Sequence, residues 1–152
     1  MSELTMCGYR CDLCKAFSQN IEKKDEREKL SAAWKKYYEL NIPAANIYCD
    51  SCRCSKPDAK RLDMDCPVRN CVIKKGVLHC GQCNEYPCET FNQRKGLTYD
   101  EAKQQQGENF DPNEYNHFLL AFDNQTTLNQ YKDELKNNLS IIFLEEICLK
   151  MS

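Results

Sequence analysis

Twelve of the 152 residues are cysteine, and their grouping constrains the fold of this chain more than any other feature of the sequence. The first group stands in "MCGYRCDLCKAF", where Cys7, Cys11 and Cys14 follow the pattern C-x3-C-x2-C. Such a group can bind a structural metal, carry an iron–sulfur cluster, perform redox chemistry or form disulfides. The choice among these uses decides most of the functional interpretation.

The redox state of the compartment decides whether cysteines are expected to form disulfides or to bind metal. The opening residues contain no apolar segment typical of a secretory signal, so we expect a cytoplasmic protein. A mean hydropathy of -0.72 and 29% charged residues indicate a soluble chain, and no run reaches the roughly 18 apolar residues of a membrane span. Disulfides are rare in a reducing compartment, and C-x2-C pairs are the usual spacing of metal knuckles. Metal–thiolate bonding is therefore the leading interpretation, with a secreted disulfide scaffold as the alternative.

The charge changes sign along the chain. Residues 1–96 carry 17 Lys+Arg against 13 Asp+Glu, a net charge of +4, and residues 97–152 carry 4 against 10, a net charge of -6. We therefore expect a cysteine-rich metal-binding domain over residues 1–96 and an acidic helical extension over residues 97–152 that packs on it. An excess of +4 is too small to indicate a nucleic-acid partner by itself.

Helical patterns separate the cysteine groups. Apolar residues around Trp34 recur at helical spacing in the segment 21–40, which predicts a core-packed helix that ends before Pro43. Pro67 suits the first turn of a short helix and Gly76 suits its C-terminal cap. These segments predict helices on either side of a polar loop.

The C-terminal third has a helical pattern throughout. Residues Thr98–Glu101 match a capping box, and Asp111 suits an N-cap before the proline that follows it. From Thr127 onward an apolar stripe continues a helix, and we expect Cys148, which stands in this stripe, to be a core residue. The sequence thus predicts a mainly α, small, metal-stabilised cysteine-rich fold with zinc knuckles, little sheet and C-terminal helices.

The cysteines fall into two sets by their proximity in the sequence. A tetrahedral zinc site needs two knuckles face to face, with each sulfur about 2.3 Å from the ion. Pairing Cys11–Cys14 with Cys49–Cys52 meets this requirement, and Cys80–Cys83 can be completed by Cys66 and Cys71, or by Cys88 in place of one of them. The first set is Cys7, Cys11, Cys14, Cys49, Cys52 and Cys54, and the second is Cys66, Cys71, Cys80, Cys83 and Cys88. Spacing alone does not decide which cysteine joins which site.

Each set holds more thiols than the four that one zinc ion needs. The excess is explained by buried free cysteines, by a two-metal cluster with bridging thiolates, or by an iron–sulfur cluster. Paired C-x2-C knuckles favour zinc over iron. The pattern C-x3-C-x2-C also occurs in radical S-adenosylmethionine enzymes, but no series of strand–helix units follows it in this chain.

These segments together resemble a known family. "CGYRCDLC", the Trp34 helix, "CDSC", "CPVRNCVIKKG" and "CGQCNEYPCE" follow in the order of the cysteine-rich microbial family catalogued as domain of unknown function 3795, over about residues 6–90. The resemblance implies a small metal-binding domain and no established activity. Its candidate ligands are Cys7, Cys11, Cys14, Cys49, Cys52, Cys66, Cys71, Cys80, Cys83 and Cys88. Cys54 and Cys148 depart from the shared pattern.

Other chemistry has weaker support in the sequence. His79 adjoins Cys80, which makes an exposed position or a contact to a ligand more plausible than ligation, and His117 is interpreted as a surface or packed residue. The stretches "RCSKPDAKRL" and "RNCVIKK" are basic, but no aromatic residue interleaves with them, so a solvated loop is favoured over a phosphate contact. We predict no catalytic residue, and a non-enzymatic role is favoured over catalysis.

The leading hypothesis is a zinc-binding protein whose metal sites are structural and which acts as an interaction module with a protein partner. One alternative is an iron–sulfur or thiol redox protein, and another is a nucleic-acid-binding zinc module. No membrane partner is expected.

Overall fold

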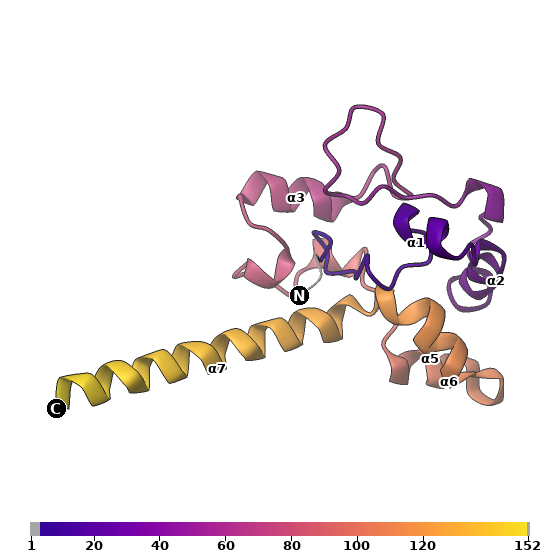
Figure 1. Cartoon of the computed structure of the whole chain (residues 1–152). Helices are drawn as coiled ribbons and strands as arrows, with labels where there is room; N and C mark the ends of the chain where they lie inside the picture. Colours follow the sequence, from indigo (N-terminus) through magenta and orange to yellow (C-terminus); the bar gives the residue numbers. More distant parts are fainter. Residues whose placement is uncertain (1–3, 152) are drawn as a thin grey trace.

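The chain forms a helical body from which one long helix projects, in a computed structural model that describes residues 4–151 (Figure 1). Helices make up 59% of the structure, and no sheet forms among the described residues. Isolated bridges join Leu4 to Arg10 and Phe17 to Cys49. The prediction of a mainly helical fold with little sheet is confirmed.

The elements follow one another with short connections, and most helices are short. Their order is α1 (Ser18–Lys23), α2 (Arg27–Tyr38), η1 (Ala44–Asn46), α3 (Pro67–Lys75), η2 (Cys80–Gln82), α4 (Glu89–Asn92), α5 (Tyr99–Gln106), η3 (Gly107–Asn109), α6 (Pro112–Glu114), η4 (Tyr115–Leu119), η5 (Leu120–Phe122) and α7 (Asn124–Met151).

The segment predicted as one helix around Trp34 is two helices, α1 and α2. The backbone is extended at Lys24, and the Asp25 carboxylate then accepts a 3.1 Å hydrogen bond from the Arg27 backbone N–H, which starts the second helix. Helix α2 ends at Tyr38 because Glu39 adopts a left-handed conformation with φ of 56°. The helix therefore ends before the proline predicted to stop it.

The predicted helix ends elsewhere are confirmed. Pro67 is the first residue of α3, and Gly76 caps it with φ of 69°. The Thr98 hydroxyl accepts the Glu101 backbone N–H at 3.2 Å, and the Glu101 carboxylate accepts the Thr98 backbone N–H at 3.0 Å, which completes the capping box of α5. Asp111 caps α6. These ends depend on local chemistry, which is why the sequence predicts them.

One apolar core lies between α2 and the chain that follows α5. The predicted core residue Trp34 is buried, and so is Tyr37. Residues from both parts of the chain share this core, so the segment after residue 97 packs against the cysteine-rich segment. Its most buried members are Ala16, Leu30, Ala33, Tyr37, Ile47, Ala102, Tyr115, Leu119 and Ala121.

A second core joins α3, α4 and the start of α7. Val68 and Val72 of α3 pack with Phe91 of α4 and Leu128 of α7. The N-terminal turn passes over this core at Gly8, whose φ is +95° and where an added Cβ would stand 2.7 Å from Leu128 Cγ. Only glycine combines that conformation with so close an approach.

The first residue of α7 ties the helix to the body. Asn124 is fully buried, and its side-chain amide donates to the carbonyls of Cys7 at 2.9 Å and Arg94 at 3.1 Å. Its side-chain oxygen accepts the Gly96 backbone N–H at 3.0 Å. One side chain thus joins the N-terminal turn, the segment after α4 and α7.

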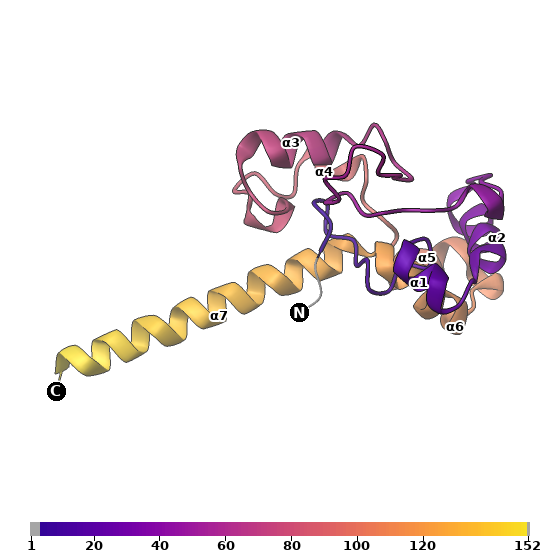
Figure 2. The same ribbon diagram turned by 45° about the horizontal axis from the view of Figure 1, so that its top comes forward.

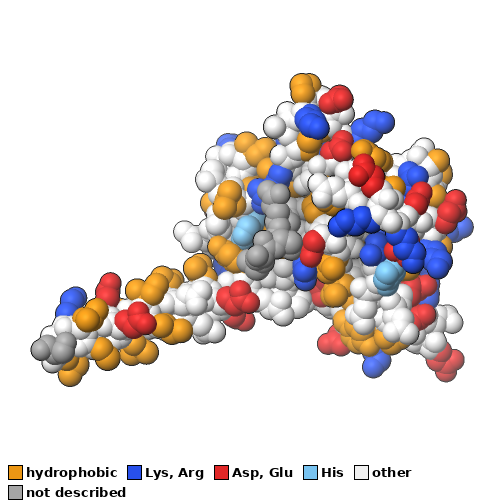
Figure 3. Space-filling view, in the orientation of Figure 1, with side chains coloured by type: hydrophobic (Ala, Val, Ile, Leu, Met, Phe, Trp, Pro, Cys, Tyr) orange, Lys and Arg blue, Asp and Glu red, His pale blue; other side chains and the backbone are white. Residues whose placement is uncertain are grey.

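The second half of α7 leaves the body and projects away from it (Figures 1 and 2). Apolar side chains are exposed along this projecting part (Figure 3), namely Leu135, Leu139, Ile141, Ile142, Phe143, Leu144, Ile147, Leu149 and Met151. Cys148 is exposed as well, so its prediction as a core residue is wrong: the helix continues beyond the surface that it packs against. No helix within residues 4–151 is both long and apolar enough to cross a membrane.

Candidate metal centre

Six cysteines line one cavity of about 130 Å³, which we call the six-cysteine chamber. Its members are Cys7, Cys11, Cys14, Cys49, Cys52 and Cys66. The two predicted knuckles, Cys11–Cys14 and Cys49–Cys52, therefore face the same space. Cys66 lies here rather than in the second set, because it precedes α3 while Cys71 stands on that helix.

Tight turns present these thiols to the chamber. The Cys14 backbone N–H donates to the Cys11 carbonyl at 3.2 Å, which folds the first knuckle. The bridge between Phe17 and Cys49 then brings the second knuckle beside it. Ser51, inside that second knuckle, has a positive φ of 82°. Both C-x2-C segments are thus turns beside one another, and their use as metal knuckles stays a prediction.

Several sulfurs of the chamber have hydrogen-bond partners. The Met6 backbone N–H donates to Cys52 Sγ at 3.4 Å, and Thr5 Oγ1 lies 3.5 Å from Cys7 Sγ. The Cys11 thiol donates to Ser51 Oγ at 3.7 Å. A donor to sulfur, such as the Met6 N–H, stabilises a thiolate once its proton is gone.

Burial shapes the acidity of these thiols. Burial, with a smaller contribution from the thiols of Cys66 and Cys52, raises the pKa of Cys7 to about 12. It raises the pKa of Cys14 to about 12 in the same way, with Cys11 adding to the effect. Neutral thiols are poor nucleophiles, so burial does not activate Cys7 or Cys14 as a nucleophile. A bound cation reverses the preference because only the thiolate is a ligand.

Three arginines line the six-cysteine chamber: Arg61, Arg69 and Arg94. Arg69 donates to the Cys52 carbonyl at 3.1 Å, and Arg94 forms an ion pair with Asp63. Arg61 donates to the Cys54 carbonyl through one terminal nitrogen, while its buried Nε has no hydrogen-bond partner in the described part of the chain. A buried unpaired donor is costly, so its position beside the cavity suits a ligand that accepts a hydrogen bond.

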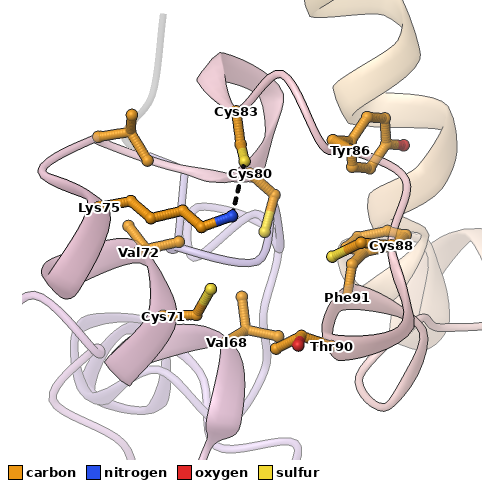
Figure 4. Close-up of a pocket in the computed structure, with 11 residues that line it drawn as sticks. Val68, Cys71, Val72, Lys75, Cys80, Cys83, Tyr86, Cys88, Thr90 and Phe91 are labelled. Atoms are coloured by element: carbon orange, nitrogen blue, oxygen red, sulfur yellow. Dashed lines mark hydrogen bonds between the residues drawn. The ribbon is translucent and has the colours of Figure 1, made fainter.

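A second cavity lies on the other side of α3, and we call it the four-cysteine chamber. Cys71 of α3, Cys80 and Cys83 of the "CGQC" turn, and Cys88 at the start of α4 line a void of about 10 Å³. The Cys83 backbone N–H donates to the Cys80 carbonyl at 3.0 Å, which makes "CGQC" a tight turn. In Figure 4 these four side chains point into a common space.

A cationic side chain reaches into the four-cysteine chamber. The Lys75 ammonium, on α3, donates to Cys83 Sγ at 3.4 Å (Figure 4). It also pairs with the Glu85 carboxylate. The bond to Glu85 and the bond to Cys83 raise the pKa of Lys75. Burial raises the pKa of Cys80 to about 12, and the thiols of Cys88 and Cys71 add to the rise. The positively charged Lys75 ammonium therefore lies beside the sulfurs of this chamber.

The structure leaves two cysteines and both histidines away from the chambers. Cys54 lines neither cavity, and Cys148 lies on the projecting part of α7. His79 is buried, accepts the Gly81 backbone N–H at 3.0 Å and packs edge-on against Tyr131, so the expectation of an exposed position is wrong. His117 lies 2.9 Å from the Glu26 carboxylate, on the surface.

The thiols surround spaces rather than touch a common point. Among residues 4–151, no three side chains of histidine, cysteine, aspartate or glutamate converge closely enough to hold one ion. The donor set itself fits a thiophilic metal, because ten thiols from four segments line two cavities. Any metal must therefore either fill the cavities or draw the sulfurs inward.

The profile of one family matches residues 3–93, a stretch that holds all ten cysteines of the two chambers. This family is described as "Protein of unknown function (DUF3795)". The chain belongs to this family. The match confirms the resemblance drawn from the cysteine segments, and helix α7 lies outside it. A search of curated proteins and a search of solved structures found no match.

The sequence interpretation missed the charged residues that line the chambers. It assigned the basic stretches to a solvated loop, yet Arg61 and Arg69 line the six-cysteine chamber and Lys75 reaches into the four-cysteine chamber. Arg53 also turns inward and donates to the carbonyls of Leu4 and Leu78. These basic residues stand near cysteines in the sequence, and this was the one signal that they line the chambers. It does not distinguish a side chain that faces a chamber from one that faces solvent.

Proposed function

We propose that the protein is a metal–thiolate protein with a structural zinc ion in the four-cysteine chamber. One observation carries this proposal: four thiols surround a void of about 10 Å³, which is the room of about one water-sized atom. A tetrahedral zinc ion takes four thiolates at about 2.3 Å, so small inward movements of the four side chains complete the site.

Charge and ligand number favour a structural role for this zinc. Four thiolates on one zinc leave a net charge of about -2, and the Lys75 ammonium is placed to balance part of it through its bond to Cys83. Four protein ligands leave no open position for a substrate, which is the arrangement of structural rather than catalytic zinc. Because only the folded chain assembles the site, zinc binding adds folding free energy, on the order of 10 kcal/mol in peptide systems.

The test is zinc content per chain, measured on protein purified without added metal. We expect Cys80→Ser and Cys83→Ser to lower zinc by about one ion per chain and to lower the melting temperature. Cys54→Ser and Cys148→Ser are matched controls, because these cysteines line neither chamber, and they should leave zinc unchanged. Unchanged zinc in the first pair would show that the four-cysteine chamber is not the site.

The partner that we propose is a second copy of this chain, bound through the projecting half of α7. Its nine exposed apolar side chains present on the order of 1,000 Å² of apolar surface, if their exposed fractions are applied to ordinary side-chain areas. Each partner of a standard interface contributes about 800 Å², and because these side chains lie around the whole circumference of α7, a second copy covers one side of this surface. Glu145 and Glu146 in the same segment disfavour an anionic lipid surface as the occupant.

Sedimentation velocity tests this interface. We expect the wild-type chain to dimerise at micromolar concentration and Ile142→Glu to make it monomeric. Ile73→Glu on α3 is the matched control, because Ile73 and Ile142 are equally exposed, at 53% and 52%, and only Ile142 lies on the projecting helix. A wild-type chain that stays monomeric, or that binds lipid vesicles instead of itself, would overturn this proposal.

A further inference from the structure

The six-cysteine chamber differs in size from the four-cysteine chamber, and this difference points to another kind of metal centre. We propose that the six-cysteine chamber binds a [4Fe–4S] iron–sulfur cluster. This inference rests on the proposed function, because it takes the buried cysteines of the body to be metal ligands. It goes beyond that function by assigning a second, chemically different centre.

Volume supports a polynuclear centre. The chamber measures about 130 Å³, and a water molecule occupies about 30 Å³ in the liquid, so there is room for several atoms and not for one alone. A single zinc ion leaves most of this volume empty. A [4Fe–4S] core brings eight atoms, four irons and four sulfides, and fills it.

The arrangement of the sulfurs supports the same choice. A binuclear zinc site with bridging thiolates needs all six sulfurs gathered onto two adjacent ions in the middle of a cavity of about 130 Å³. A cluster that supplies its own sulfides holds its cysteine ligands farther apart, around a core, and needs only four of them. The knuckles Cys11–Cys14 and Cys49–Cys52 offer four thiols, and they face the cavity together.

The charges around the chamber fit an anionic cluster. An oxidised [4Fe–4S] core with four thiolates carries a net charge of about -2, and three arginines line the cavity against one aspartate, Asp63. The buried Nε of Arg61 has no hydrogen-bond partner among residues 4–151, and a cluster sulfur is an acceptor that satisfies it. The Met6 N–H bond to Cys52 Sγ is a further donor of the kind that tunes such clusters.

Analysis of the full-length chain tests the inference. Protein purified without oxygen from cells supplied with both iron and zinc should contain about four iron, about four acid-labile sulfide and about one zinc per chain. It should be brown, and reduction by one electron from dithionite should produce a paramagnetic signal. The Cys11→Ser, Cys14→Ser double variant should lose iron and sulfide while it keeps zinc.

Control variants separate this centre from the zinc site. Cys83→Ser should lose zinc and keep iron, and Cys54→Ser should keep both. Arg61→Gln removes the positive charge and the Nε–H donor and should shift the reduction potential of the bound cluster to a more negative value. An unchanged potential in Arg61→Gln would overturn the role assigned to Arg61.

The outcomes distinguish this inference from the proposed function. Colourless protein with zinc but no iron or sulfide would overturn the cluster and leave the metal–thiolate function standing. Protein without zinc, iron or sulfide under the same conditions would overturn both. Iron and sulfide that persist in the Cys11→Ser, Cys14→Ser variant would place the cluster elsewhere and overturn this assignment.

Discussion

Replacement of Asn124 by alanine tests the junction between α7 and the cysteine-rich body. The side-chain amide makes three hydrogen bonds at 2.9–3.1 Å, to the carbonyls of Cys7 and Arg94 and from the Gly96 N–H. The Arg94 carbonyl keeps a second partner, because it also accepts the Tyr9 hydroxyl at 2.6 Å. The substitution therefore acts mainly through the Cys7 carbonyl and the Gly96 N–H, which lose their hydrogen bonds to this amide.

The expected loss follows from these two groups. An unsatisfied buried polar group costs about 1–3 kcal/mol, so Asn124→Ala should lower the free energy of unfolding by about 2–6 kcal/mol. Because one kcal/mol corresponds to about 2–4 °C for a chain of this size, the melting temperature should fall by about 5–20 °C. Total stability is about 5–15 kcal/mol, so the effect is a large share of it.

Urea unfolding at equal metal content measures this change, with matched variants on the same helix. Asn138→Ala changes the same side chain at an exposed position of α7 and should alter stability by less than about 0.5 kcal/mol. Asn124→Asp keeps an acceptor for Gly96 but loses both donors, so it should also destabilise. An Asn124→Ala variant as stable as Asn138→Ala would refute the idea that this amide holds α7 to the body.

Three further predictions follow from local features. Gly8→Ala should lower the free energy of unfolding in urea by about 2–4 kcal/mol, because it adds both backbone strain and a clash with Leu128. Gly76→Ala should lower it by about 1 kcal/mol, because a Cβ added there has no neighbour within 4 Å. Equal losses in the two variants would contradict the close approach of Gly8 to Leu128. The hydrogen bond from the Arg27 side chain lowers the pKa of Asp25 from 3.8 to about 2, so its contribution to folding is present above about pH 3.8 and is lost as the pH falls toward 2. Arg27→Gln should return that pKa toward 3.8 in an NMR titration, and an unmoved value would disprove the pairing. Removal of metal by a chelator should lower the melting temperature, and an unchanged melting curve would argue against structural metal.

Local chemistry explains which features of the fold could be predicted. The helix ends at Pro67, Gly76, Thr98 and Asp111 depend on residues within one turn, and each prediction was confirmed. The break between α1 and α2 was missed because the apolar spacing around Trp34 runs across it without a change. Periodicity reports the face of a helix and is insensitive to a short interruption.

The length of α7 shows a second limit of periodicity. The apolar stripe predicts a helix, and the helix is present. The pattern does not predict whether another element packs against that stripe. Leu128 is fully buried and Leu149 is 75% exposed on the same helix. Cys148 was therefore predicted as core and is exposed.

The sequence by itself determined the family, the helical class, the positions of the caps and the ten cysteines that line the chambers. Tertiary structure alone decided how those cysteines are divided, because α3 separates Cys66 from Cys71 although they are five residues apart. It also decided that Arg61 and Lys75 face the sulfurs. Spacing along a chain restricts which thiols can meet locally, but only the packing of distant segments sets the volume that they enclose.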